Sequence, residues 1–207
     1  QAMMDLSKNF HADVVLKTAT SLHNTCLNLT RGQYLDMSYE KRKDLTIEDY
    51  WLMVEGKTAA LLSACTHIGA ILGDTDNETV EQARIFGRDL GLAFQVQDDI
   101  LGIWGDEAVT GKSTMGDLVE GKNSLPVLYG LSQKGRFARR WAESAIRQDE
   151  VAEVAQMLRD EGAYDYSQRE AQRLTSQALG ALEKIRPSDA AGEALFELVY
   201  KLLNRES

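Results

Sequence analysis

The sequence has 207 residues and a mass of 23.0 kDa, with 43% hydrophobic and 27% charged residues. It is long and apolar enough to bury a core, which excludes a disordered chain. Two prolines, and apolar residues weighted toward Leu and Ala, favour long helices over sheets. The formal net charge of −9 excludes binding of nucleic acid or of an anionic membrane through a broad basic surface.

Helical spacing of apolar residues predicts three long helices in the first half of the chain, at about 13–40, 47–72 and 78–104. Thr46 and Asp49 form a capping-box pattern at the start of the second helix. The apolar residues of the first helix recur along one face. The predicted architecture is therefore a set of packed helices.

The second half begins with residues 105–123, where four spaced glycines and no sustained periodicity predict a long ordered loop. Ser124 and Pro126 then open a helix, with Ser as cap and Pro in the first turn. Three or four more amphipathic helices are expected, at about 135–147, 149–161, 164–185 and 189–204. No linker divides the chain, so residues 1–207 are expected to form a single helical domain.

Cys26 and Cys65 both stand in apolar helical surroundings, which predicts buried thiols in a reducing compartment. The longest apolar stretch, at 59–62, is too short to cross a bilayer, and the first residues show no export signal pattern. The expected location is the cytoplasm.

Paired carboxylates give the first sign of chemistry. Asp98 and Asp99 are adjacent in an apolar helical stretch, and they share a helix face with Gln95 and Gly102. Their mutual repulsion calls for a cation opposite that face. The alternative is an exposed helix edge or pairing with Arg.

Lys112 and Lys122 follow in glycine-rich surroundings, where backbone and ammonium can approach an oxyanion closely. Acids and lysines at one helix end are compatible if Mg²⁺ and a phosphate lie between them, since Mg²⁺ commonly takes one or two carboxylates together with phosphate oxygens. The alternative is a pair of solvated lysines.

Lys57 is the only Lys or Arg between Trp51 and Ile71. A lysine in so apolar a helix is costly unless an anion meets it, although it could also reach solvent from a half-buried face. Gly56 beside it weakens the helix and could free backbone carbonyls. Asp36, one turn before Glu40 on the first helix, is by itself most often part of a solvated stripe.

Together these motifs resemble the trans-isoprenyl diphosphate synthase, or polyprenyl synthetase, family, particularly bacterial short-chain farnesyl and geranylgeranyl diphosphate synthases. The resemblance rests on the order and spacing of Gly-Gln-Tyr-Leu-Asp at 32–36, Gly-Lys-Thr at 56–58, Phe-Gln-Val-Gln-Asp-Asp at 94–99, Gly-Asp at 105–106, Thr-Gly-Lys at 110–112 and Gly-Lys-Asn-Ser-Leu-Pro at 121–126.

The resemblance implies an all-α fold of antiparallel helices around a central cavity, as in isoprenoid synthases, and a homodimer. It implies an enzyme, a trans-prenyltransferase, that condenses an allylic prenyl diphosphate with isopentenyl diphosphate and releases diphosphate. Mg²⁺ is the implied cofactor. Such an enzyme must also keep water from the allylic cation, which an apolar helical cavity does.

The resemblance also assigns roles to single residues. Asp98 and Asp99 would bind Mg²⁺, and the carbonyl side of Lys57 and Thr58 would face the allylic cation together with Gln95. The remaining assignments concern substrate contacts and their support: Lys57, Lys112 and Lys122 would contact diphosphate oxygens, Phe94 would lie near isopentenyl diphosphate, and Gln33 and Asp36 would support these groups from behind.

Two departures from the family pattern shape the expectation. Gly102 stands where many members carry a third Asp of the second aspartate-rich motif, which leaves the number of metal-bound carboxylates open. The family's first aspartate-rich motif would precede Gln1, so the N-terminal helices are expected to be missing and residues 1–207 alone are expected to make no prenyl diphosphate. Two alternatives remain: a non-catalytic subunit of a heteromeric synthase, and a class I terpene cyclase on the same fold.

Overall fold

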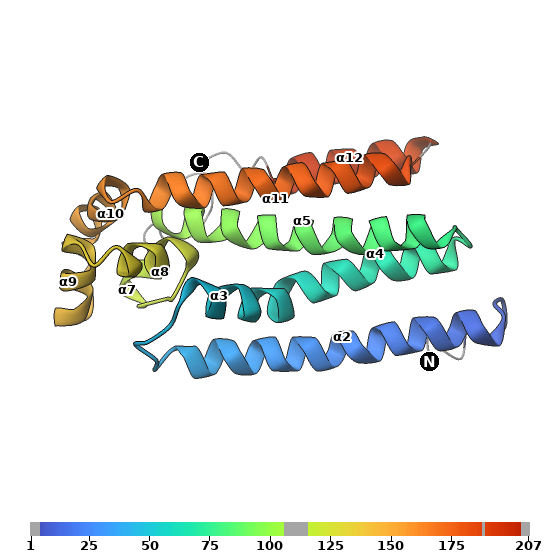
Figure 1. Cartoon of the computed structure of the whole chain (residues 1–207), viewed down its shortest axis with the longest axis horizontal. Coiled ribbons are helices and arrows are strands. Elements are labelled where there is room, and N and C mark those ends of the chain that lie inside the picture. Colours follow the sequence, from blue (N-terminus) through green and yellow to red (C-terminus); the bar gives the residue numbers. More distant parts are fainter. Residues whose placement is uncertain (1–4, 106–115, 188, 204–207) are drawn as a thin grey trace.

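The chain folds into helices that run back and forth beside one another (Figure 1). The computed structural model describes residues 5–105, 116–187 and 189–203, and within these ranges every regular element is helical. The elements are α2 (Ala12–Tyr39), α3 (Ile47–Val54), the π-helical turn η1 (Glu55–Ala59), α4 (Ala60–Leu72), α5 (Asn77–Trp104), α7 (Gly116–Val119), α8 (Leu125–Ser132), α9 (Arg136–Glu143), α10 (Val151–Asp160), α11 (Ala163–Ile185) and α12 (Asp189–Leu203). The predicted all-α class is confirmed.

Four long segments lie side by side in Figure 1, in the order α2, α3 to α4, α5 and α11, and neighbours run antiparallel. The short helices α7 to α10 gather at one end of these segments, where α2 and α5 finish and α3 and α11 begin. This end therefore brings together three stretches that the sequence places far apart: the end of α2, the end of α5, and the turn after α7.

Side-chain caps form at the starts of α3 and α5. Thr46 and Asp49 form the reciprocal capping box of α3, and Asp76 caps α5 by accepting a hydrogen bond from Thr79 N at 2.8 Å. The expected cap at Ser124 is wrong in one respect: Ser124 occupies the N-cap position of α8, but its hydroxyl is buried and caps nothing. Of the loop predicted at 105–123, residues 106–115 lie outside the described residues, and residues 116–119 form α7 instead of a loop.

The helix predicted at 47–72 is interrupted by η1, at the weak point expected from Gly56. The cause is a close approach of α2. A Cβ atom added to Gly32 would overlap the backbone nitrogen of Lys57, and one added to Gly56 would lie 2.9 Å from Asn28 O. The paired glycines Gly32 and Gly56 thus allow the two helix backbones to touch at the point where the hydrogen-bond pattern of the second helix changes to that of a π-turn.

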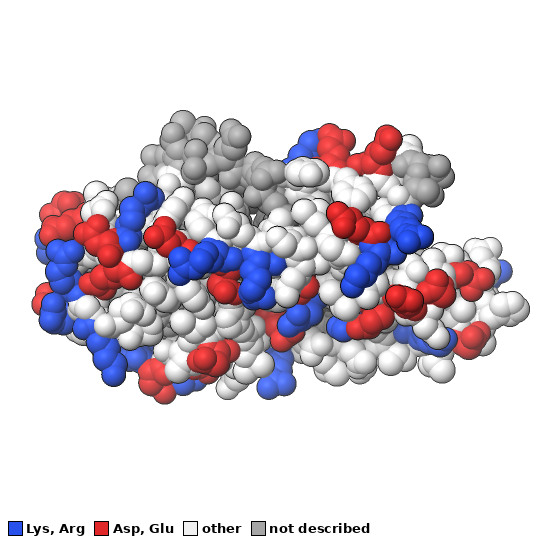
Figure 2. Space-filling view, turned by 45° about the horizontal axis from the view of Figure 1, so that its top comes forward, with Lys and Arg blue, Asp and Glu red and all other residues white. Residues whose placement is uncertain are grey.

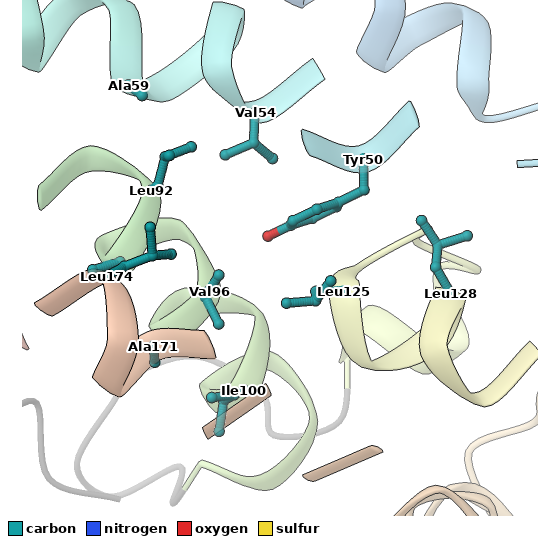
Figure 3. Close-up of a cluster of buried hydrophobic side chains, with 11 residues drawn as sticks. Tyr50, Val54, Ala59, Leu92, Val96, Ile100, Leu125, Leu128, Ala171 and Leu174 are labelled. Atoms are coloured by element: carbon teal, nitrogen blue, oxygen red, sulfur yellow. The ribbon is translucent and has the colours of Figure 1, made fainter. Parts of the chain in front are cut away.

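A core cluster joins α3, α5, α8 and α11 beside this end of the bundle. Tyr50 of α3 projects toward Val96 of α5 and Leu125 of α8, and Leu174 of α11 closes the group (Figure 3). All four side chains are almost completely buried. Burial of large apolar groups of this kind contributes about 1.5–3 kcal/mol each, so the cluster fixes the end of α5 against α8.

Helix α2 does not bury its largest apolar residues. Its buried residues are Thr18, Thr25, Gly32 and Tyr39, which recur every seven positions and face the other helices. Leu16, Leu27 and Tyr34, on the opposite face, are 67%, 57% and 70% exposed. The apolar face predicted from the sequence is therefore directed inward only in part: Leu16, Leu22 and Cys26 are exposed, and the half-buried members are Val15, Ala19, Leu29 and Leu35.

The expectation of buried thiols is wrong, since Cys26 and Cys65 are both exposed and free. Each side chain lies on an outward-facing position of its helix, α2 and α4 respectively, and apolar neighbours in sequence did not reveal this.

Figure 2 shows acidic and basic side chains interspersed across the face in view. Within the described ranges, no helix is both long enough and apolar enough to cross a membrane.

Candidate active site

A continuous chain of hydrogen bonds crosses the end of the bundle where the predicted site residues gather. Thr58 Oγ1 in η1 donates to Gln95 Oε1 of α5 at 2.9 Å. Gln95 Nε2 donates in turn to Asp99 Oδ1 at 3.1 Å, and Lys122 Nζ donates to the same oxygen at 3.1 Å. The two contacts fix the orientation of the Gln95 amide, because its oxygen accepts and its nitrogen donates. Four predicted residues from three segments thus form one network.

Asp99 is the centre of this network. Its side chain is 1% exposed, and its second oxygen, Oδ2, accepts a hydrogen bond from the Leu125 backbone at 3.1 Å. A buried carboxylate that is fully hydrogen-bonded and paired with a lysine is held firmly in place. Asp98, the next residue, is half-buried and more accessible. The two carboxylates therefore differ: Asp99 ties α5 to α8, while Asp98 lies nearer the solvent.

Lys122 is enclosed by a second carboxylate that the sequence reading did not single out. Asp117 Oδ2 accepts a hydrogen bond from Lys122 Nζ at 2.8 Å. The backbone repeats the contact: Lys122 N donates to Asp117 O at 2.9 Å, Gly121 N donates to Leu118 O, and Gly121 has φ +70°. This is a Schellman closure of α7, which glycine at the left-handed position permits. The Asp-x-x-x-Gly-Lys spacing was the available signal.

Charge and burial shift the ionisation of this group. Burial by itself would lower the pKa of the Lys122 ammonium, but the neighbouring carboxylates of Asp99 and Asp117 outweigh it, so that pKa is raised. Burial raises the pKa of the Asp117 carboxyl, Lys122 opposes this change, and the negative charges of Asp99 and Asp98 add to it. Lys122 is consequently a firmly protonated cation at neutral pH.

Lys57 forms an ion pair with Asp36, which is the anionic partner expected for a lysine in so apolar a helix. Lys57 Nζ in η1 donates to Asp36 Oδ2 near the end of α2 at 2.6 Å, and the two side chains are 38% and 29% exposed. The pair spans the glycine contact between Gly32 and Gly56. The close approach of the two backbones therefore places Lys57 beside Asp36 and keeps both groups accessible to solvent.

Three predicted residues remain to be placed. Phe94 is half-buried on α5, and Gln33 is exposed on α2. Lys112 lies outside the described residues.

Two buried hydroxyls border the network. Tyr50 Oη and Ser124 Oγ are buried and have no hydrogen-bond partner among the described residues. Burial, and then the negative charges of Asp99 and Asp98, raise the pKa of the Tyr50 hydroxyl well above its usual value. The Tyr50 hydroxyl points toward α5 in Figure 3. Sequence patterns could not place either hydroxyl near Asp99, because the proximity comes from packing of α3 and α8 on α5.

A groove of about 970 Å³ runs between α2 and α4 and reaches the first half of α5. Gly32, Gly56 and Ala59 line it near Lys57, together with Arg88, whose guanidinium pairs with Glu55 at 2.6 Å, and Arg84 lines it one turn earlier on α5. Asp98, Asp99 and Lys122 are not among its lining residues. The groove therefore begins near Lys57 and extends away from the paired carboxylates Asp98 and Asp99.

The oxygen donors of the site can hold a hard cation only if a bound ligand supplies further coordinating oxygens. The carboxylate oxygens of Asp98 are of the kind that Mg²⁺ prefers, and Lys57 and Lys122 are placed to meet an anion. Among the residues that the structure describes, no three His, Cys, Asp or Glu side chains form a ready-made metal site. Such a site fits a cation that takes most of its ligands from phosphate oxygens and water.

The architecture matches solved isoprenyl synthases. The polyprenyl synthetase of Streptomyces coelicolor A3(2) superposes with a TM-score of 0.83 and 31% identity, over 96% of this chain and 61% of that one. The polyprenyl synthase of Caulobacter crescentus CB15, solved in complex with calcium and isoprenyl diphosphate, gives a TM-score of 0.80 and 28% identity, over 92% of this chain and 60% of that one. The fold is that of the isoprenoid synthases.

The sequence comparisons identify the family. The polyprenyl synthetase family model matches residues 1–160. The (2E,6E)-farnesyl diphosphate synthase of Mycobacterium tuberculosis H37Rv is 34% identical over 187 residues, covering 86% of this chain and 52% of that enzyme. The chain belongs to the polyprenyl synthetase family, and it spans about half the length of such curated relatives.

Proposed function

We propose that this chain provides the diphosphate-binding wall of a trans-prenyltransferase that joins an allylic prenyl diphosphate to isopentenyl diphosphate. The observation that carries the proposal is the network from Thr58 through Gln95 and Asp99 to Lys122, with Lys57 and Asp98 at the same end of the bundle. Two lysines, an accessible carboxylate and a π-turn in one place suit ionisation of a diphosphate ester. Family membership supports the same reaction.

In the proposed reaction the allylic carbon–oxygen bond breaks and its electron pair leaves with the diphosphate. The alkene of isopentenyl diphosphate then forms the new carbon–carbon bond, and a proton is lost from the adduct. Lys57 and Lys122 would donate to diphosphate oxygens as negative charge builds up, which stabilises the transition state more than the ground state. Backbone carbonyls of the π-turn at Lys57 and Thr58, with Gln95, would face the allylic cation.

We further propose Asp98 as the principal protein ligand of Mg²⁺ on this wall. Mg²⁺ would neutralise the leaving diphosphate. Asp99, with both oxygens engaged in hydrogen bonds, would support the site by holding Lys122 and the end of α5. This division differs from the equal roles that the motif suggests for the two residues. The known complex of the C. crescentus relative with calcium and isoprenyl diphosphate supports a divalent cation as cofactor.

The groove between α2 and α4 is proposed to take the hydrocarbon chain of the allylic substrate. Its near part is lined by Gly32, Gly56 and Ala59 beside Lys57, so a diphosphate held by Lys57 could extend its prenyl tail into the groove. Helix walls around the tail would exclude water from the cation.

Two predictions from the sequence, a homodimer and a cytoplasmic location, remain predictions. The outer face of α2, with Leu16, Leu27 and Tyr34 exposed, supports association with another protein surface, since apolar faces of this kind mark interfaces. Light scattering of the purified protein measures the mass directly.

Turnover assays distinguish the proposed function from its alternatives. The chain, and the same chain extended upstream of Gln1 to the length of its relatives, are incubated with Mg²⁺ and an allylic diphosphate, with and without isopentenyl diphosphate. The proposal expects the extended chain to form a longer prenyl diphosphate only when both substrates and Mg²⁺ are present.

Other outcomes contradict the proposal. Release of diphosphate with formation of a hydrocarbon, without isopentenyl diphosphate, identifies a terpene cyclase. Absence of any turnover until a second, different subunit is added identifies a non-catalytic partner.

A further inference from the structure

Asp117 has a place in the site that neither its sequence position nor the family resemblance assigns. It is the second residue of the single turn α7, which Leu118 anchors in the core with a completely buried side chain. From there its carboxylate contacts α5. A Cβ atom added to Gly102 would overlap the Asp117 carboxylate, so this acid packs directly against the bare backbone of Gly102.

This packing concerns the position at which the chain has Gly102 and many family members have a third Asp. The second aspartate-rich motif ends there without a third acid, yet a third carboxylate lies in the space next to Gly102. It is supplied by Asp117, fifteen positions later in the sequence, and glycine leaves it room. A carboxylate from a separate helix therefore lies beside both Gly102 and Lys122.

The geometry at Lys122 defines what this carboxylate does. A lysine ammonium has three N–H donors. One contacts Asp99 Oδ1 at 3.1 Å and one contacts Asp117 Oδ2 at 2.8 Å. The side chain remains 37% exposed. Within the described part of the chain the ammonium has these two acceptors, so its third donor can meet an external anion in a direction set by the other two.

We propose that Asp117 is a positioning residue for prenyl transfer: together with Asp99 it orients the Lys122 ammonium so that one N–H meets the leaving diphosphate. This inference rests on the proposed function for its ligand. Charge-assisted hydrogen bonds from two sides restrict the ammonium, and misplacement of a catalytic group by about 1 Å can cost about 10²-fold in rate. Asp117 acts through Lys122 and does not touch the substrate.

The proposal separates binding from turnover. In Asp117→Asn the side chain keeps its shape, Lys122 keeps its charge and its bond to Asp99, and one negative charge near the diphosphate site is removed. Affinity for Mg²⁺ with inorganic diphosphate, measured by calorimetry on the 207-residue chain, should stay within about threefold of wild type or improve. The kcat of the extended chain should fall about tenfold or more, because Lys122 is no longer oriented.

A spectroscopic measurement tests the orientation without turnover. The ¹H–¹⁵N signal of the Lys122 ammonium should be visible in the wild type, where two ion pairs slow its exchange with water, and identified by its loss in Lys122→Arg. It should be lost or strongly broadened in Asp117→Asn. Gly102→Ala provides a second variant, since the added methyl group displaces the Asp117 carboxylate and leaves its charge in place; the same loss of signal is expected. Asp160→Asn, at an exposed ion pair elsewhere, is the matched control and should change nothing.

The outcomes separate this inference from the proposed function. If the wild type neither binds Mg²⁺ with diphosphate nor turns over in its extended form, the proposed function fails. If the wild type does both, and Asp117→Asn and Gly102→Ala retain the Lys122 signal and the wild-type kcat, the positioning role is wrong. A parallel loss of melting temperature and of diphosphate affinity in Asp117→Asn would assign Asp117 a merely structural role and would equally overturn the inference.

Discussion

Lys57 and Lys122 are the two described lysines predicted to meet diphosphate, and the structure holds them in different ways. Their side chains are almost equally exposed, 38% and 37%. Lys57 has one partner, Asp36, which is itself 29% exposed. Lys122 lies between Asp117 and Asp99, of which Asp99 is buried. The exposed fraction of a lysine side chain alone therefore does not show how readily the ammonium can exchange its carboxylate partner for another anion.

The comparison teaches that the two lysines have separate tasks in the proposed site. A single, partly exposed ion pair contributes on the order of 1 kcal/mol, so Lys57 can exchange Asp36 for a substrate oxygen at little cost. A buried carboxylate with several donors costs about 3–5 kcal/mol when its pairing is broken, so Lys122 stays with Asp99. Lys57 is the adaptable contact, and Lys122 is the fixed one.

The largest effect is expected on the fixed side. Asp99→Ala leaves Lys122, Gln95 and the Leu125 backbone without their shared acceptor, and we expect the free energy of unfolding to fall by about 3–5 kcal/mol. Urea unfolding followed by circular dichroism measures the change. The matched substitution Asp98→Ala should cost less stability than Asp99→Ala, because the Asp98 side chain is only half-buried. Equal losses in the two variants would remove the distinction between the neighbouring acids.

On the adaptable side the effect should appear in turnover. Lys57→Ala and Asp98→Ala are each expected to lower kcat of the extended chain by at least about 10²-fold, since each removes a group proposed to stabilise the leaving diphosphate. The helical spectrum and melting temperature should remain those of the wild type. Normal turnover in either variant, with the fold intact, contradicts the metal-diphosphate site.

The glycine contact that places Lys57 gives the next prediction. Gly32→Ala puts a methyl group against the backbone of Lys57 in η1, where no flexible side chain can move aside. We expect a loss of about 1–3 kcal/mol in the free energy of unfolding, as for overpacking in a core. Gly180→Ala is a suitable control, because a Cβ atom there meets nothing within 4 Å and α11 should be stabilised or unchanged. An unaffected Gly32→Ala would mean that the two helices can separate freely.

The smallest effect on stability is expected at an ion pair far from the site, and this effect should depend on pH. Glu150 pairs with Arg140 and accepts from Arg147 N at 2.8 Å, and these contacts lower its pKa to about 2. A carboxyl whose pKa is lower in the folded state stabilises the fold above its unfolded pKa of about 4.3 and loses that contribution as the pH falls toward 2.

Glu150→Gln tests this direction. The variant should be less stable than the wild type at pH 6, and the difference between the two unfolding free energies should shrink between about pH 4.3 and 2. A difference that does not change over this range would show that the pair does not titrate with folding.

Much of the scaffold followed from local sequence. Periodicity and caps predicted the long helices, because Thr46 with Asp49 and the breaks at Gly162 and Pro187 act within a few residues. The outward face of α2 was not predictable: Leu16 and Cys26 are apolar in sequence, and only packing shows that Thr18 and Thr25 are the buried positions.

The site was predicted as a set of residues and not as a network. The motifs identified Lys57, Gln95, Asp99 and Lys122 as a group, and the structure connects Gln95, Asp99 and Lys122 by hydrogen bonds. They did not identify Asp117, because its contact with Lys122 depends on the tight turn at Gly121 and on the space beside Gly102. Nor did they separate Asp98 from Asp99, since their difference in burial comes from the packing of α8.

The central claim is that this end of the bundle binds a diphosphate and a divalent cation between Lys57, Asp98 and Lys122. The most direct test is a crystal structure of the chain grown with Mn²⁺, in place of Mg²⁺, and inorganic diphosphate. The account predicts an anomalous Mn²⁺ peak next to Asp98, with diphosphate oxygens in contact with Lys57 and Lys122. A diphosphate bound elsewhere, for example at Arg84 and Arg88 in the groove, with no Mn²⁺ at Asp98, would contradict it.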